Sequence, residues 1–227
     1  MKKYSKLLIQ EEAHRCLLCY DAPCSKVCPA KSNPSEFIRS LRFENMSGAL
    51  NNLRAQNPLA ATCSDLCDGS EFCEKVCIRN KIGSPVQIQT IHKYLSEQNL
   101  LPMEKVSNST KIACYGDNLS SILLGIYLFS YGYDVYIFAD TNLLGTLGSE
   151  KITKDLDCLK KEGLTVLNTS DFSKYAKNAD CYISSHDMEL ASSRITPPTL
   201  SDDANFVQKM SVVRTEAKKI IKNMEVK

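Results

Sequence analysis

The chain has 227 residues, of which 43% are hydrophobic and 24% charged, and its 28 basic and 26 acidic side chains give a formal net charge of +2. This composition is typical of a globular protein with one large or two small domains, and it excludes a low-complexity chain. The charges form no basic stripe of the kind that nucleic-acid binding requires, so no nucleic-acid partner is expected.

The N-terminus and the apolar runs argue against export and membrane insertion. The short apolar run 7–9 is followed at once by Gln10 and two glutamates, which is not the pattern of a secretory signal. The longest apolar stretch, 122–129, is far below the ~20 residues of a membrane span. We therefore expect a cytoplasmic protein, in which thiols stay reduced and an odd total of eleven cysteines is not a disulfide framework.

Eight of the eleven cysteines fall into two groups. The first group, spaced C-x2-C-x4-C-x3-C, is Cys16, Cys19, Cys24 and Cys28. The second group, spaced C-x3-C-x5-C-x3-C, is Cys63, Cys67, Cys73 and Cys77. The other three, Cys114, Cys158 and Cys181, are isolated and are expected to be ordinary core residues.

The spacing of the first group favours iron–sulfur ligation, with zinc as the main competitor. Zinc sites usually show two C-x2-C pairs separated by a dozen or more residues. Ferredoxin-type ligation uses cysteines at short intervals, ends in Cys-Pro and lends the last cysteine to a second cluster, and Cys28-Pro29 fits that ending. One loop can wrap three corners of a cubane, so the fourth ligand must arrive from elsewhere. Cross-ligation between the two groups is therefore expected.

The segments between the two cysteine groups are predicted to be helical. Apolar residues recur at three- and four-residue steps after Pro34 and again after Ser47. Two short helices there would bring the cysteine groups together. A further helix is predicted over 86–94 and carries His92. A histidine in such a place is, on its own, more often a packing or surface residue than a ligand.

Five segments carry a likeness to a known family. They are EEAHRCLLCYDAPCSKVCPA, PSEFIRSLRFENMSGAL, QNPLAATCSDLC, FCEKVC and SPVQIQTIHKYL. Over residues 10–96 the chain resembles the N-terminal helical domain of the dihydropyrimidine dehydrogenases, in particular their bacterial NAD-dependent small subunit. It is also similar to the small subunit of glutamate synthase.

The resemblance implies two [4Fe-4S] clusters that pass electrons between an FAD and a partner enzyme. One cluster would be held by Cys16, Cys19, Cys24 and Cys77. The other would be held by Cys28, Cys67, Cys73 and the residue at the position of His92. Cys63 matches a family cysteine that is not a ligand.

The chain departs from the family pattern at two positions in this region. His92 stands where the pyrimidine dehydrogenases have glutamine, and histidine can ligate iron and raises the potential when it replaces thiolate in Rieske centres. Asp68 stands where the family usually has proline. Its charge should disfavour cluster reduction if it is buried and do little if it faces water.

The polar, irregular residues 99–110 are predicted to be a linker to a second domain. Strands are predicted over 111–115, 134–138, 164–168 and 180–184, with helices over 119–130 and 152–162. This alternation predicts a half-size α/β sheet. Over 111–135 it resembles the FAD-binding domain that follows the cluster domain in the same family.

The nucleotide-binding motif of that second domain is degenerate. The G-x-G-x-x-G motif lets backbone approach a pyrophosphate, but here the string is GDNLSS. Gly116 remains, while Asn118 and Ser121 replace the other glycines and Asp117 adds negative charge. Ala139 stands where an acid would hold the ribose. Gly116 is therefore the one candidate cofactor-binding residue, and only if FAD is retained.

The C-terminal segment predicts an amphipathic helix that covers the sheet. Its apolar stripe consists of Phe206, Met210, Val213, Ala217, Ile220 and Met224. The nicotinamide-binding domain that normally follows in the family is expected to be absent.

We thus predict an all-α iron–sulfur domain of the α-helical ferredoxin type over 1–98, a linker over 99–110, and a truncated Rossmann-like FAD/NAD-binding-type α/β domain over 111–227. The function expected is that of an electron-transfer subunit, which relays electrons through two [4Fe-4S] clusters between a flavoenzyme partner and a redox partner. No acid, base or nucleophile constellation stands out, so the chain is expected to belong to an oxidoreductase complex without a catalytic site of its own.

Two alternatives remain open from the sequence. A reduced oxidoreductase subunit could still hold FAD through backbone contacts around Gly116, and flavin absorbance would reveal it. A zinc-stabilised interaction module would be colourless and would leave the resemblance around the cysteines unexplained.

Overall fold

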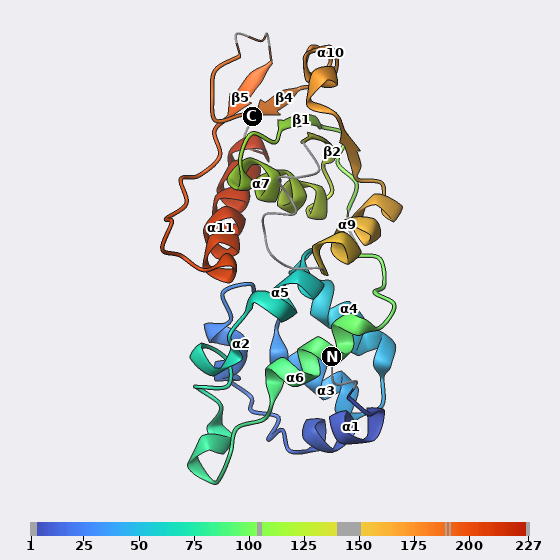
Figure 1. Cartoon of the computed structure of the whole chain (residues 1–227), viewed down its shortest axis with the longest axis vertical. Helices are drawn as coiled ribbons and strands as arrows, with labels where there is room; N and C mark the ends of the chain where they lie inside the picture. The colour runs from blue at the N-terminus through green and yellow to red at the C-terminus, as the bar shows by residue number, and fades with distance from the viewer. Residues whose placement is uncertain (1–3, 104–105, 140–150, 189, 191, 226–227) are drawn as a thin grey trace. The chain divides into compact units, whose positions relative to one another are not determined.

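A computed structural model of the chain describes residues 4–103, 106–139, 151–188, 190 and 192–225 (Figure 1). The chain divides into two compact units, Met1–Met103 and Glu104–Lys227. Helices and a five-stranded parallel sheet make up the fold, so the predicted mixture of helix and parallel sheet is confirmed. Among the residues described, no helix is both long and apolar enough to cross a membrane.

Short helices make up the regular structure described in the first unit. They are α1 (Lys6–His14), α2 (Pro23–Val27), α3 (Pro34–Arg42), α4 (Met46–Arg54), α5 (Ala60–Leu66), the 3-10 turns η1 (Gly69–Glu71) and η2 (Ile78–Lys81), and α6 (Ile88–Glu97). Local signals start several of them. Ser5 caps α1 by accepting from Leu8 N at 3.2 Å, and Asn45 caps α4 by accepting from Gly48 N at 2.8 Å. Proline opens α2 and α3, where its missing N–H costs nothing.

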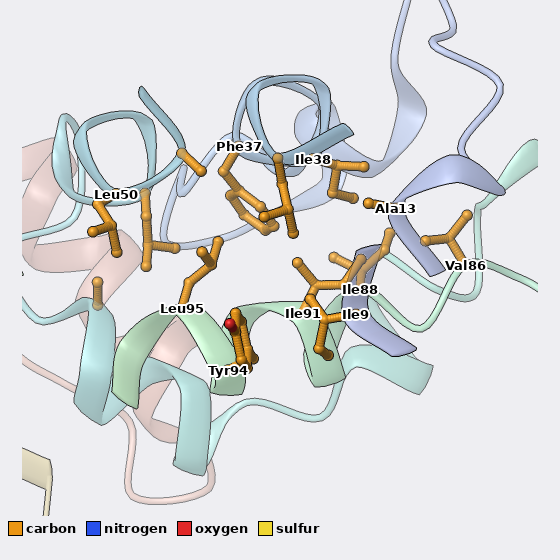
Figure 2. Close-up of a cluster of buried hydrophobic side chains, with 14 of the residues drawn as sticks. Ile9, Ala13, Phe37, Ile38, Leu50, Val86, Ile88, Ile91, Tyr94 and Leu95 are labelled. Atoms are coloured by element: carbon orange, nitrogen blue, oxygen red, sulfur yellow. The ribbon is translucent and has the colours of Figure 1, made fainter. Parts of the chain in front are cut away.

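One apolar core holds the first unit together. It is formed where α3 packs against α4 and where α1 and α6 close over them (Figure 2). Phe37 and Ile91 lie at its centre with no exposed surface. Each buried side chain of this size contributes roughly 1.5–3 kcal/mol. This core fixes α6 against α1 and α3.

The second unit contains the sheet. Its strands are β1 (Lys111–Tyr115), β2 (Asp134–Phe138), β3 (Thr165–Leu167), β4 (Cys181–Ile183) and β5 (Ser193–Ile195). Its helical segments are α7 (Leu119–Ser130), α9 (Lys151–Lys161), the 3-10 turn η3 (Thr169–Asp171), α10 (Phe172–Ala176) and α11 (Phe206–Glu225).

The strands run in the order β3-β2-β1-β4-β5, and every pair is parallel. In the register, Ile112 of β1 faces both Val135 of β2 and Cys181 of β4. The chain leaves β1 toward β2 on one side and returns to β4 on the other. In open parallel sheets this reversal creates the crevice where ligands bind, at the carboxyl ends of the strands.

Helix α7 is buried on nearly every side. It packs on β1 and β2 with one face and on α11 with another (Figure 1). Gly125 permits the close approach to the sheet, since a Cβ there would lie 3.1 Å from the Cys114 sulfur. The C-terminal helix therefore rests on α7, whereas the amphipathic stripe alone predicted that it would cover the sheet.

The segments predicted in the second unit largely agree with the structure. The bounds of β1, α7 and β2 are those expected.

In the first unit, the helix predicted over 86–94 instead runs over Ile88–Glu97, because Gln87 is its N-cap residue. Helices α1, α2, α5 and α10 and strand β5 were not predicted.

Candidate metal centre

Four cysteines from both sequence groups line one pocket, called the first pocket here. Cys16 follows α1, Cys19 lies in the loop after it, Cys24 is in α2, and Cys77 is the N-cap of η2. All four are half-buried. Cys77 is therefore separated from the second sequence group and placed with the first, which is the combination that the family resemblance implies.

The remaining candidate ligands line another pocket, called the second pocket. Cys28 and Cys67 stand at the C-terminal ends of α2 and α5, Cys73 lies in the loop after η1, and His92 is in α6. Cys63 also lines this pocket. The structure thus brings together every candidate ligand that the sequence proposed for the second set.

The two pockets share a wall. Ile88, in the first turn of α6, lines both of them and has only 2% of its surface exposed. Ile88 also belongs to the apolar core of the first unit, which is drawn in Figure 2. The buried side chain of Ile88 is therefore common to the linings of the two pockets.

The loop that carries Cys16 and Cys19 is tightly turned. Leu18, between them, has a left-handed backbone with φ of 51°, which costs a residue with a side chain roughly 1–2 kcal/mol. Arg42, at the end of α3, holds the start of the loop by donating from Nη1 to the Cys16 carbonyl at 2.5 Å. Both features direct the two sulfurs to the same pocket.

Gln89 fixes the loop around the second pocket. Its amide Nε2 donates to the carbonyl of Cys67, and its Oε1 accepts from Gly69 N at 3.3 Å. One side chain of α6 thereby satisfies two backbone groups of the segment that carries the ligands. No sequence motif marked Gln89, because its partners lie 22 and 20 residues away.

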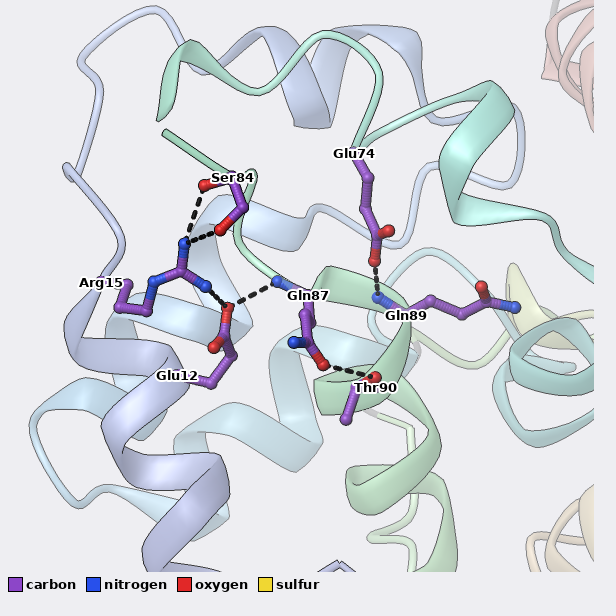
Figure 3. A network of polar contacts seen from close by, with 7 residues as sticks. All are labelled: Glu12, Arg15, Glu74, Ser84, Gln87, Gln89 and Thr90. Atoms are coloured by element: carbon purple, nitrogen blue, oxygen red, sulfur yellow. Dashed lines mark hydrogen bonds and ion pairs between the residues drawn. The ribbon is translucent and has the colours of Figure 1, made fainter. Parts of the chain in front are cut away.

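The N-terminus of α6 is held by carboxylates from two other segments (Figure 3). Glu12 of α1 accepts from Gln87 N at 2.7 Å, and Glu74 accepts from Gln89 N at 2.8 Å. Arg15 braces Glu12 at 2.6 Å and also donates to the Ser84 carbonyl at 2.7 Å. Acidic groups stabilise the positive end of a helix. The network ties α1, the Cys73–Cys77 segment and α6 together.

His92 is buried in the second pocket, with 8% of its surface exposed. Its Nε2 lies 2.9 Å from the Ala60 carbonyl, and its ring lies 5.9 Å from that of Phe37. A carbonyl can only accept, so Nε2 is the donor in this hydrogen bond. Metal-binding histidines are commonly oriented by such a hydrogen bond from the second ring nitrogen.

The thiols are held in surroundings that disfavour an isolated thiolate. Burial raises the pKa of Cys24 to about 11 and also raises the pKa of Cys16, Cys28 and Cys73. Thiolates gathered in this way need a cation to compensate their charge. A metal or an iron–sulfur cluster supplies that compensation.

Cys63 differs from the candidate ligands. Its thiol donates a hydrogen bond to the Cys67 sulfur, which raises the pKa of Cys63 and lowers the pKa of Cys67. A thiol that donates to the sulfur of a candidate ligand is placed to support that ligand.

The donor set matches an iron–sulfur cluster. Soft thiolate sulfur is the ligand type that such clusters use, and imidazole replaces it in some of them. Within the described ranges, no three Cys, His, Asp or Glu side chains converge closely enough to hold a single metal ion. The candidate ligands instead surround the two pockets.

Asp68 faces solvent. Its carboxylate accepts from Ser70 N at 3.0 Å and from Ser70 Oγ at 2.6 Å, and these bonds lower the pKa of Asp68. Of the two cases open from the sequence, the exposed one applies, in which the charge does little to a nearby cluster.

In the second unit, the end of β1 differs from a dinucleotide site. Asp117 accepts from Ser121 Oγ at 2.8 Å and from Ser185 N at 3.3 Å, which bridges the ends of β1 and β4 where a pyrophosphate would bind. Asn118 caps α7 by accepting from Ser121 N at 2.8 Å. Gly116 is packed so closely that a Cβ would lie 2.8 Å from the Cβ of Ala139. Packing alone accounts for this glycine.

Comparisons with known proteins agree with the cysteine pattern. Residues 1–102 match the family model described as dihydropyrimidine dehydrogenase domain II, 4Fe-4S cluster. The chain is 35% identical over 140 residues to the NAD-dependent dihydropyrimidine dehydrogenase subunit PreT of Salmonella typhimurium and to that of Escherichia coli strain K12. A PreT homolog of Salmonella typhi matches equally. Each match covers 60% of this chain and 34% of the relative, so the chain spans about a third of their length.

Proposed function

We propose that this chain is an electron-transfer subunit of an oxidoreductase complex, because residues 1–102 match the family model described as dihydropyrimidine dehydrogenase domain II, 4Fe-4S cluster. It relays electrons through two [4Fe-4S] clusters between a flavoenzyme partner and a second redox partner. The arrangement of the candidate ligands around two adjacent pockets is the observation that carries the proposal. Each bound cluster supplies one-electron redox chemistry.

The ligand sets follow from the pockets. In the first pocket the proposed ligands are Cys16, Cys19, Cys24 and Cys77. In the second pocket they are Cys28, Cys67, Cys73 and His92. The Ala60 carbonyl orients the His92 ring by accepting from Nε2, and Nδ1 is the nitrogen proposed to bind iron. Cys63 supports Cys67 and does not bind iron in this proposal.

The proposed division of labour follows the two predicted domains, 1–98 and 111–227, joined by the linker 99–110. The first is an α-helical ferredoxin-type domain that performs the redox chemistry. The second is a degenerate FAD-type domain that serves as scaffold and docking surface for a flavoprotein or other oxidoreductase partner. Asp117 supports the absence of FAD, because its carboxylate would repel a pyrophosphate at the end of β1.

The test is a measurement of iron, acid-labile sulfide and flavin on one anaerobically purified sample, together with its visible spectrum. About eight irons and about eight sulfides per chain without flavin is the expected result for two clusters. Stoichiometric FAD would show that the chain is a flavoenzyme subunit. Zinc without sulfide would replace the proposal by a zinc-stabilised module.

A further inference from the structure

Arg79 is a charged residue at the first pocket that the proposed ligand set leaves unused. It is the second residue of η2, two places after Cys77, and it lines the pocket together with the four cysteines. Its Nε atom is buried and has no hydrogen-bond acceptor in the described part of the chain. A buried guanidinium N–H without an acceptor is unfavourable and requires an explanation.

The neighbouring guanidinium groups do not share this property. Arg42 donates to the Cys16 carbonyl, and Arg15 donates to Glu12 and Ser84. Those contacts explain why the two arginines stand where they do. For Arg79, by contrast, the described residues provide no acceptor for the buried Nε–H, although the residue lines the pocket.

We infer that Arg79 donates from Nε to a sulfur atom of the cluster in the first pocket and raises the reduction potential of that cluster. The inference rests on the proposed function, since it requires the cluster. A cubane with four thiolate ligands is anionic, and one-electron reduction adds a further negative charge. A charge-assisted donor therefore stabilises the reduced state more than the oxidised state, and hydrogen bonds to sulfur are a recognised means of tuning such potentials.

The test compares three variants of the complete protein with the wild type. Arg79→Gln removes both the guanidinium Nε–H and the charge. Arg79→Lys keeps the charge but lacks the fixed planar donor. Lys81→Gln is the matched control, because it removes a positive charge from the exposed end of the same 3-10 turn.

The readouts are iron and sulfide content, followed by a redox titration monitored by electron paramagnetic resonance. The signal of the first-pocket cluster is identified as the one that Cys24→Ser alters. In Arg79→Gln, the equilibrium constant for its reduction should fall about tenfold, which is about 59 mV for a one-electron couple. In Arg79→Lys this equilibrium constant should fall by less, and in Lys81→Gln it should stay within about twofold of the wild-type value. The reduction potential of the second cluster should not change in any variant.

An unchanged potential in Arg79→Gln, or an equal shift in Lys81→Gln, would overturn the inference. If Arg79→Gln does not retain its iron, Arg79→Lys decides the test. An unaltered potential of the first-pocket cluster in that variant would contradict the inference, and a lowered potential would support it. Wild-type protein without iron and sulfide would overturn the proposed function as well, and that result is obtained before any titration begins.

Discussion

At the scale of single residues, spacing indicated iron–sulfur ligation and the family resemblance implied the candidate ligands, but neither predicted what orients them. The intervals between the cysteines and the Cys-Pro ending are local features, and they indicated iron–sulfur ligation directly. The supporting residues are not local. Glu12 meets Gln87 across 75 positions, and Gln89 meets Cys67 across 22. Such contacts are created by packing of the whole unit, so the sequence alone could not predict them.

The role of His92 leads to a prediction at this scale. His92→Ala should lose about half of the iron, because one ligand of the second pocket disappears while the first pocket keeps all four of its cysteines. His92→Gln should retain more iron, since the side-chain oxygen can still bind. Iron and sulfide analysis with electron paramagnetic resonance on the same samples gives the answer.

Cys63→Ala is the matched control for that prediction. Cys63 lines the same pocket and is also buried, but its thiol donates to Cys67 and is not a proposed ligand. Its removal should leave the iron content unchanged. Equal iron loss in both variants, or equal loss from both clusters in His92→Ala, would contradict the assignment.

At the scale of elements, the segments that were predicted carry their own signals. Helix α7 has an apolar run and a capping Asn118, and the short apolar strands β1 and β2 precede and follow it in the chain. Helix α5 was missed because its small residues show no clear period, and they are buried by tertiary packing. Strand β5 has only three residues, and its pairing with β4 defines it.

The N-terminus of α6 gives the prediction for this scale. Glu74→Ala should lower the free energy of unfolding by about 1–2 kcal/mol, because Gln89 N loses its acceptor at the positive end of the helix. Glu74→Gln should lower the free energy of unfolding by about half as much, because an acceptor oxygen remains while the charge is gone. Urea titrations followed by circular dichroism under anaerobic conditions measure both.

Glu71→Ala serves as the control for the change at Glu74. Glu71 is exposed and pairs only with Lys75 among the contacts described, an ion pair of the kind that adds little stability. Its loss should change the unfolding free energy by less than about 0.5 kcal/mol. Similar losses at Glu71 and Glu74 would show that the contact with α6 has no special importance.

At the scale of the whole molecule, all proposed ligands lie in the unit Met1–Met103. The second unit has a sheet and an apolar interior of its own, with Phe138, Phe172 and Tyr182 packed together. The alternation of strands and helices predicted that sheet, whereas the filling of its crevice by Asp117 and Ser185 became visible only in three dimensions.

Removal of the clusters should therefore affect one unit. Oxidation with ferricyanide in the presence of a chelator should lower the midpoint temperature of one calorimetric unfolding transition, that of the unit Met1–Met103, by about 10 °C or more. The reason is that bound clusters stabilise only the folded state of their own unit. The other transition should stay in place. Chelator without oxidant is the control, and equal displacement of both transitions would be evidence against separate stabilisation.

The shared wall formed by Ile88 has a consequence for how many electrons the chain can handle at once. Because this buried side chain lines both pockets, an electron on one of the two clusters proposed here could pass to the other across Ile88. A reduced flavin gives up two electrons, and each cluster accepts one. The two clusters together would then accept both electrons of a reduced flavin. The second electron could enter the chain before the first has left it.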